Sequence, residues 1–250
     1  MTKAMLAMLS VILVAGCGGS GWTGYSPLYP PLTIFAASSL QPAFDKIGQK
    51  AISQRITTPT FNYAGTQTLA AQLLQGGPGD VFAAADTAHM TTVDSAGLLS
   101  GPSRIFAHNK LEIAVGSGNP KGIHTLADLS RSGLVVVLAD PSVPAGKYAQ
   151  QALSQAHVTV HPASLELQVT GVLSKVALGE ADAGIVYVSD IVTSGKVDGV
   201  TIPDSQNVVA DYPIAVLKAA SNAAAASAFI DLVISPDGQA ILKAAGFQGV

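Results

Sequence analysis

Short apolar runs alternate with stretches of helical periodicity from Leu32 to the end of this 250-residue chain. The runs are almost continuously apolar, which is typical of strands buried on both faces of a sheet. Between them, apolar residues recur at the spacing of one helix face. This alternation predicts an α/β fold with helices on both faces of the sheet. Strands are expected at residues 32–36, 60–63, 81–84, 110–115, 133–138, 183–188 and 212–218.

The positions of the expected helices indicate how the chain is divided into lobes. The last two have no strand after them, so they must pack on structure formed earlier in the chain. A chain that leaves a first lobe near Ala107 and returns to it near Asp211 explains this order, although a single doubly wound domain shows the same alternation. Helices are expected from about Ser39, from about residue 66 through Leu69, Leu73 and Leu74, and at residues 145–156, 169–178, 223–233 and 237–245.

The only cysteine, Cys17, ends a segment with the features of a secretory signal peptide. Lys3 supplies the positive start, residues 4–15 form an apolar run, and Gly16 is the small residue at the cleavage point. The run is shorter than the roughly 20 residues of a membrane span. A buried cysteine in an apolar helix is the alternative. Residues 13–17 resemble the lipobox of bacterial lipoproteins, in which the cysteine sulfur is diacylated.

This resemblance implies a signal peptide at residues 1–16 and a lipidated tether at residues 17–31. The tether is rich in Gly, Ser and Pro and has no periodicity. Two acyl chains on Cys17 anchor a protein stably. We therefore expect an extracytoplasmic protein that a lipid holds at the cell membrane.

Composition and motifs exclude several classes of function. Charged residues make up 12% of the chain and the net charge is −3, which argues against binding nucleic acid. Nucleophile-elbow and P-loop motifs are absent, and no Gly-x-Gly-x-x-Gly motif follows an expected strand. The five histidines lack metal-ligand spacing, even His157 and His161 across an expected strand, so surface positions are expected. Asp80 and Asp86 could form a catalytic pair, but turn or capping roles are favoured. No metal ligand or cofactor is predicted.

One arrangement recurs where strands end. A small polar or backbone-exposing turn is followed by a helix at Ser38–Ser39 and at residues 64–68, 144–146 and 168–169. Free N–H groups and partial positive charge at helix N-termini can bind an anion without a cationic side chain. Each turn could instead be an ordinary N-cap. Because ligands bind at the carboxyl ends of strands in open α/β sheets, convergence on one anion is the preferred interpretation.

The same segments resemble the molybdate-binding proteins of ABC importers (ModA-type), which have the two-lobed class II periplasmic binding protein fold. The similarity runs from about Leu32 to the end and keeps the order of the motifs. The segments that carry it are residues 34–40 (IFAASSL), 63–69 (YAGTQTL), 79–86 (GDVFAAAD), 140–149 (DPSVPAGKYA), 184–190 (GIVYVSD) and 235–247.

The resemblance assigns five oxyanion-binding residues. Ser39 falls on the family's first binding serine, and Thr66 replaces a second serine while keeping its hydroxyl. Ala145 and Val169 fall on positions that offer backbone N–H groups, and Tyr187 falls on the binding tyrosine. The resemblance also implies a first lobe at residues 32–107 and 212–250 and a second at residues 108–211, with the ligand in the cleft between them.

The implied function is a monomeric receptor that binds molybdate, and tungstate as well, and delivers it to an ABC permease and its ATPase. None of the five residues is charged, so phosphate, which needs an acceptor for its proton, is disfavoured. A receptor for sulfate or another oxyanion is the nearest alternative. A lipoprotein hydrolase using Ser38 or Ser39 lacks a recognisable base, and a purely structural lipoprotein would bind no ligand.

Overall fold

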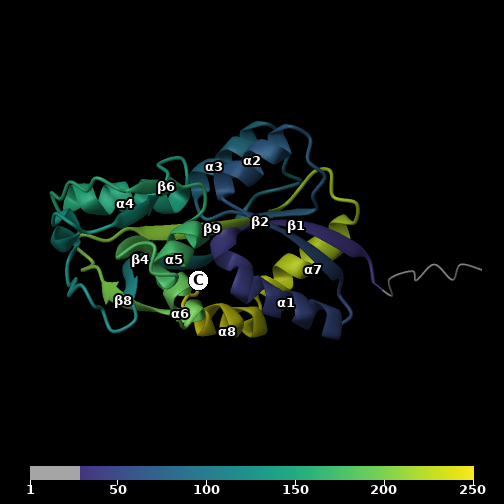
Figure 1. Cartoon of the computed structure of the whole chain (residues 1–250). Coiled ribbons are helices and arrows are strands. Elements are labelled where there is room, and N and C mark those ends of the chain that lie inside the picture. The colour runs from purple at the N-terminus through teal and green to yellow at the C-terminus, as the bar shows by residue number, and fades with distance from the viewer. Residues whose placement is uncertain (1–28) are drawn as a thin grey trace, which may run out of the picture.

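Strands and helices alternate through residues 29–250, which are the part of the chain that the computed structural model describes (Figure 1). The predicted signal peptide and Cys17 lie outside this part. The elements are β1 (Pro31–Ala37), η1 (Ser38–Leu40), α1 (Gln41–Ser53), β2 (Thr58–Ala64), α2 (Thr66–Leu74), β3 (Val81–Ala83), α3 (Thr87–Ser95), β4 (Arg104–Gly116), η2 (Leu126–Ser130), β5 (Val136–Ala139), α4 (Pro144–Gln155), β6 (Ser164–Glu166), α5 (Val169–Ala177), β7 (Ala183–Tyr187), α6 (Val188–Ser194), β8 (Val197–Thr201), β9 (Val209–Val216), α7 (Ala223–Ile234) and α8 (Pro236–Ala244).

The strands pair in the order β2-β1-β3-β9-β4-β7-β5-β6, with β8 also on β4. Strand β4 changes partner along its length: residues 104–110 pair with β9, and residues 111–115 pair with β7. We call β2, β1, β3, β9 and the start of β4 the first half, and the remaining strands the second half. The chain passes between the halves along β4 and β9, where His108 faces Asp211 in an antiparallel register.

Helices cover both faces of each half (Figure 1). In the first half, α2 and α3 lie on one face and α1, α7 and α8 on the other. Strand alternation decides which core each side chain enters. Phe35 and Phe82 point into the smaller core under α2 and α3, whereas Ile34 and Val81 point into the main core. In the second half, α4 lies on one face and α5 and α6 on the other.

The main core continues from one half into the other. Aromatic rings link the two parts: Phe106 contacts Phe44 and Tyr212, with centroids 5.7 and 6.3 Å away. Tyr212 also meets Phe247 at 5.3 Å and Tyr187 at 5.8 Å, both edge to face. Edge-to-face contacts of this kind stabilise aromatic pairs beyond the area that they bury. Tyr212 is therefore held at the junction of the halves from several sides.

Most predicted elements are present, with shifted ends. Strand β4 begins six residues before the expected start, because its first part pairs with β9 rather than within the second half. The helix expected from Ser39 begins as the short 3-10 helix η1, and α1 starts at Gln41. The strand expected between His157 and His161 was wrong, since β6 lies at Ser164–Glu166.

Candidate functional site

All five predicted oxyanion-binding residues line one pocket between the halves of the sheet. The pocket holds about 200 Å³ of empty space. The part of it that a water-sized sphere can enter is about 10 Å³, far below the roughly 300–1,000 Å³ of sites for organic ligands, so the pocket is too small for an organic molecule. Its lining is free of charged side chains. The lining residues are Ala37, Ser38, Ser39, Ala64, Gly65, Thr66, Ala85, Val143, Pro144, Ala145, Val169 and Tyr187.

Each of the five residues lies where a strand or loop gives way to a helix. Ser39 lies in η1 directly after β1, and Thr66 is the first residue of α2. Ala145 is the second residue of α4, and Val169 is the first of α5. Tyr187 ends β7 and precedes α6. Backbone N–H groups in a first helical turn have no partner inside the helix and carry partial positive charge, so the pocket is lined with donors.

The Thr66 hydroxyl is free to donate into the pocket. Its Oγ1 accepts a hydrogen bond of 3.1 Å from the backbone N–H of Ala85. A hydroxyl has one hydrogen, and accepting a bond leaves that hydrogen available. Gly65, not Thr66, is the N-cap of α2, and no side chain caps this helix. Thr66 is therefore no ordinary N-cap.

Ser39 is tied to a strand far away in the sequence. Its Oγ lies 3.0 Å from Tyr212 Oη on β9, and both side chains are buried. The N-caps of η1 and α1 are Ala37 and Leu40, so Ser39 caps neither helix. The interpretation of Ser39 as a helix cap is thus wrong. The contact with Tyr212 was missed from the sequence because no local pattern points to a partner so distant.

The Tyr187 hydroxyl is buried without a partner. The residue is 1% exposed, and its Oη makes no hydrogen bond within the described part of the chain. A buried hydroxyl without a partner costs free energy, so native proteins rarely keep one without a reason. Burial raises the pKa of Tyr187 well above its usual value, which keeps the hydrogen on the oxygen. The hydroxyl is therefore a neutral donor that awaits an acceptor.

A buried carboxyl accepts a hydrogen bond from the backbone of Tyr187. Asp190 is 3% exposed, and its Oδ2 accepts the backbone N–H of Tyr187 at 3.0 Å. Burial raises the pKa of Asp190 to about 7, although this hydrogen bond acts in the opposite direction. The sequence reasoning missed Asp190. Its signal is the spacing of an acidic residue three positions after a helix N-cap, which is typical of a capping box.

Two close approaches bring the halves together across the pocket. Gln67 Nε2 on α2 donates to the backbone oxygen of Leu167, just before α5, at 2.8 Å. A Cβ atom on Gly65 would lie 2.5 Å from the same oxygen. Real Cβ contacts are not that short, so a glycine is needed for the turn before α2 to approach Leu167. In the sequence, Gly65 and Gln67 both belong to the motif at residues 63–69, but that motif does not indicate a contact with Leu167.

Hydrogen bonds within the loop before α4, and a glycine at the start of that helix, determine the conformation of this segment. Asp140 Oδ1 accepts hydrogen bonds from the backbone N–H and the hydroxyl of Ser142, at 2.9 and 2.7 Å. These two bonds also lower the pKa of Asp140. A Cβ atom on Gly146 would clash with the backbone oxygens of Ala139 and Asp140. Glycine therefore lets the first turn of α4 approach the end of β5, which places Ala145 at the pocket.

The other candidates from the sequence have structural roles. Asp86 caps α3 by accepting the backbone N–H of His89 at 3.0 Å. Asp80 accepts the backbone N–H groups of Thr33 and Ser221, each at 2.6 Å. The capping role is confirmed for Asp86, whereas Asp80 links the start of β1 to the loop before α7 instead of forming a turn or a cap. Residues 29–250 contain no group of three or more histidine, cysteine or acidic side chains placed to hold a metal ion.

Three of the five histidines are exposed and two are only partly covered. The exposed ones are His124, His157 and His161. His89 and His108 are half-buried and each lies against a carboxylate, Asp86 and Asp211, at 2.9 and 2.7 Å. The surface interpretation therefore holds for the first three, and each of the other two makes a hydrogen bond to a carboxylate.

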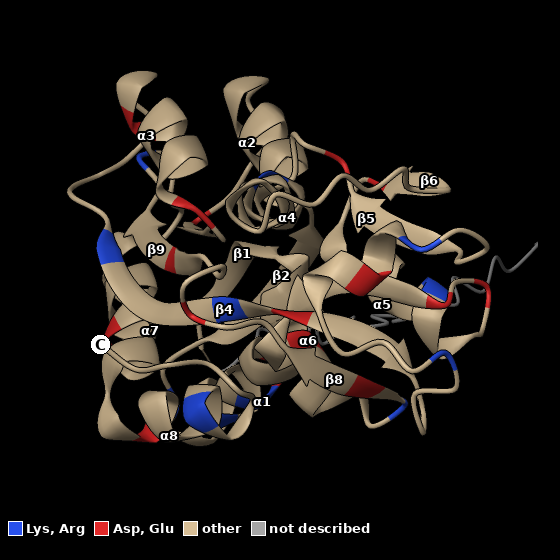
Figure 2. Ribbon diagram, turned by 90° about the vertical axis from the view of Figure 1, so that its left-hand side faces the viewer, with Lys and Arg blue, Asp and Glu red and all other residues tan. Residues whose placement is uncertain are grey.

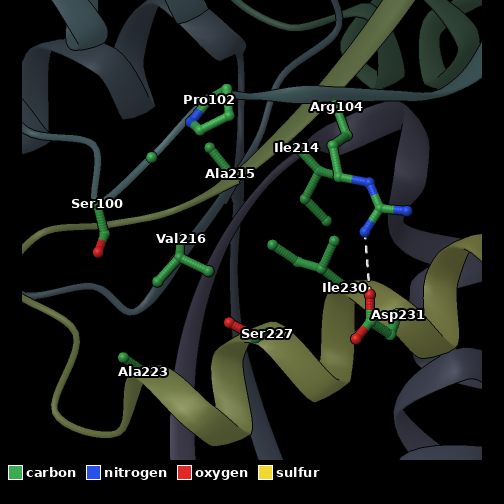
Figure 3. A pocket seen from close by; sticks show the side chains of 11 residues that line it. Ser100, Pro102, Arg104, Ile214, Ala215, Val216, Ala223, Ser227, Ile230 and Asp231 are labelled. Atoms are coloured by element: carbon green, nitrogen blue, oxygen red, sulfur yellow. Dashed lines mark hydrogen bonds and ion pairs between the residues drawn. The ribbon is translucent and has the colours of Figure 1, made fainter.

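A second pocket lies on the first half, away from all five residues (Figure 3). It contains about 590 Å³ of empty space between β9, the start of β4 and α7. Its one cationic side chain, Arg104, is paired with Asp231 at 3.0 Å, as Figure 3 shows. That pairing leaves little positive charge for an anion. Elsewhere, Figure 2 shows the few charged residues scattered over helices, strands and loops, with positive and negative positions interspersed.

Comparisons with known proteins agree with this geometry. A family described as "Bacterial extracellular solute-binding protein" matches residues 32–248. The molybdate-binding protein ModA of Mycobacterium tuberculosis (strain H37Rv) is 44% identical, over 96% of this chain and 95% of its own. None of the helices in residues 29–250 has the length and apolar character needed to span a bilayer.

Solved structures show the same fold. The substrate-binding domain of a putative molybdenum ABC transporter from Clostridium difficile aligns with a TM-score of 0.68 and 29% identity, over 88% of this chain and 99% of that chain. The sulfate-binding protein SubI from Mycobacterium tuberculosis H37Rv aligns with a TM-score of 0.81 at 18% identity, over 89% and 88%. The predicted two-lobed class II fold is thereby confirmed.

Proposed function

This chain belongs to the bacterial extracellular solute-binding proteins, to their molybdate-binding (ModA-type) family, and we propose that it captures molybdate outside the cytoplasm. The observation that carries the proposal is the buried hydroxyl of Tyr187, which has no partner among residues 29–250 and lies in a pocket that the other four predicted residues also line. An oxyanion at that place would accept the hydroxyl hydrogen. It would thereby remove the cost of the buried donor.

The chemistry of the lining supports an unprotonated dianion. The pocket offers hydroxyl groups and helix N-termini, and none of its lining residues is acidic. Molybdate and tungstate carry no proton at neutral pH and can accept from every donor. Phosphate carries a proton there, which would face no carboxylate acceptor, so its binding is disfavoured. Sulfate has the same charge and shape as molybdate and remains the alternative, distinguished by size.

The predicted donors come from two different lobes, so a ligand that contacts all of them holds the lobes together. We take residues 32–107 and 212–250 as the first lobe and residues 108–211 as the second. Ser39 and Thr66 then belong to one lobe, and Ala145, Val169 and Tyr187 to the other. An anion that contacts both sets stabilises the closed arrangement. The same proposal includes a monomeric receptor anchored by lipid on Cys17, which hands its ligand to an ABC permease driven by an ATPase.

Thermal unfolding and calorimetry with a panel of oxyanions test this function. At a ligand concentration of 100 times Kd the free energy of unfolding rises by about 2.7 kcal/mol, which shifts the midpoint by roughly 5–11 °C for a chain of this size. Molybdate and tungstate should produce this shift, and phosphate should not. A shift with sulfate alone would favour the sulfate alternative. A comparable shift with phosphate would contradict the argument from neutral donors.

A hydrolase using Ser38 or Ser39 finds no support in the geometry. Such a nucleophile needs a base within hydrogen-bond reach. The partner of Ser39 within the described residues is the hydroxyl of Tyr212. A phenol whose pKa is raised by burial is a poor base at neutral pH.

A further inference from the structure

The hydrogen bond between Ser39 and Tyr212 connects the pocket to the strand along which the chain returns to the first half. The two oxygens lie 3.0 Å apart, and either hydroxyl could be the donor. Tyr212 is fully buried and does not itself line the pocket. The direction of this bond is therefore decided by what else the Ser39 hydroxyl must do.

Each hydroxyl has only one hydrogen. A dianion without a proton can only accept, so Ser39 can bind it through its side chain only by giving that hydrogen to the ligand. Tyr212 must then be the donor in the bond that the two share. The Thr66 hydroxyl is in the same position, since it also accepts one hydrogen bond and has its hydrogen left for the pocket. There the direction of the bond is certain, because the backbone N–H of Ala85 can only donate.

We propose that Tyr212 is a positioning residue of the oxyanion site, which directs the Ser39 hydrogen into the pocket by donating its own hydrogen to Ser39 Oγ. This inference rests on the proposed function, because the direction of the bond follows from a ligand that only accepts. Tyr212 thus does for Ser39 what the Ala85 N–H does for Thr66. It acts on the ligand through Ser39 alone.

The surroundings of Tyr212 favour this direction. Tyr212 is fully buried, and among residues 29–250 the hydrogen-bond partner of its hydroxyl is Ser39 Oγ. If Ser39 were the donor, the buried hydrogen of Tyr212 would be left without an acceptor, which costs free energy. With Tyr212 as the donor, its hydrogen is paired and the Ser39 hydrogen is available to the pocket.

The ring of Tyr212 is held in place for this role. Phe106, Phe247 and Tyr187 surround it edge to face, with centroids 5.3–6.3 Å away. Burial raises the pKa of Tyr212, so the hydroxyl stays protonated. Removing the hydroxyl while leaving the ring should therefore disturb the bond and little else.

Calorimetric titration with molybdate of the wild type, Ser39→Ala, Tyr212→Phe and the double variant tests the proposal. Tyr212→Phe should weaken binding by about tenfold or more, the loss expected when one hydrogen bond to a charged group is disordered. The double variant should bind no more weakly than Ser39→Ala, because Tyr212 has no role once Ser39 is gone. Tyr63→Phe is the matched control, since it removes a hydroxyl that donates to Asp45 away from the pocket.

Wild-type affinity in Tyr212→Phe, or losses that add in the double variant, would overturn the proposal. If Tyr212→Phe does not fold, Ser39→Ala decides alone. Unchanged affinity in that variant would mean that Ser39 gives its hydrogen to Tyr212, and weakened affinity supports the proposed direction. A wild type that binds none of the oxyanions would refute the proposed function and this inference with it. Normal wild-type binding beside an unaffected Tyr212→Phe refutes the inference alone.

Discussion

Removing the hydroxyl of Tyr187 should lower ligand affinity without lowering the stability of the unliganded protein. Tyr187→Phe should weaken molybdate binding by about 1.5–3 kcal/mol, the range for a hydrogen bond to a charged group. The stability of the unliganded protein should stay the same or rise, because the substitution removes a buried hydroxyl that has no partner in the described part of the chain. Calorimetry and thermal unfolding without ligand measure the two effects. Wild-type affinity would exclude Tyr187 as a ligand residue.

At the level of single residues, the sequence predicted which residues line the pocket but not which residues hydrogen-bond to them. Ser39, Thr66, Ala145, Val169 and Tyr187 each stand in a local motif, so their neighbours in the chain identify them. Their supporting residues have no such motif. Tyr212 reaches Ser39 from 173 positions away, and the backbone N–H of Ala85 reaches Thr66 from 19 positions away. Such partners depend on strand pairing, which a single sequence does not specify.

The N-terminus of α6 carries a prediction about pH. The folded protein keeps the proton on Asp190 up to about pH 7, whereas an unfolded carboxyl loses it near 3.8. Between these values the folded state binds more protons, so the free energy of unfolding falls as the pH rises, by at most about 1.4 kcal/mol per pH unit. Above about pH 7 the contribution of Asp190 is constant.

Asp190→Asn should abolish this decline, because the amide is never charged and its oxygen can still accept the Tyr187 N–H. Denaturant unfolding of both proteins between pH 4 and 8 measures the difference. The wild type should lose stability relative to the variant as the pH rises from about 4 to about 7. Parallel profiles across this range would show that Asp190 is ionised in the folded protein.

Among the elements, buried strands and helices with one apolar face were predicted well, and the connecting strands were not. Strands β5 and β7 are continuous apolar runs, and α4 and α5 start within one residue of the expected positions. The first part of β4 mixes exposed and buried residues, because it forms the passage between the halves. No periodicity marks such a segment. Its pairing with β9 is a property of the tertiary structure.

The approach of the turn before α2 to Leu167 depends on Gly65, and this predicts a variant that folds but closes less fully. In Gly65→Ala the new methyl group would collide with the backbone oxygen of Leu167. Molybdate affinity should fall by about 5- to 150-fold, since such overlap costs on the order of 1–3 kcal/mol. Small-angle scattering should show less compaction on adding ligand than in the wild type.

Gly101→Ala is the matched control, because a Cβ atom there would meet no other atom within 4 Å. Its affinity and compaction should equal those of the wild type. If Gly65→Ala also binds and compacts normally, the approach of Gly65 to Leu167 is not needed for closure.

The two passages between the halves also determine the order in which the fold can be completed during synthesis, when the chain emerges with its N-terminus first. Strands β5 to β8 and the part of β4 that pairs with them all lie before residue 202. The first half must wait for β9, which pairs with both β3 and β4. Until Val209–Val216 has emerged, one edge of β3 remains open to pairing with another extended chain. The nascent protein is therefore most exposed to aggregation just before its last forty or so residues arrive.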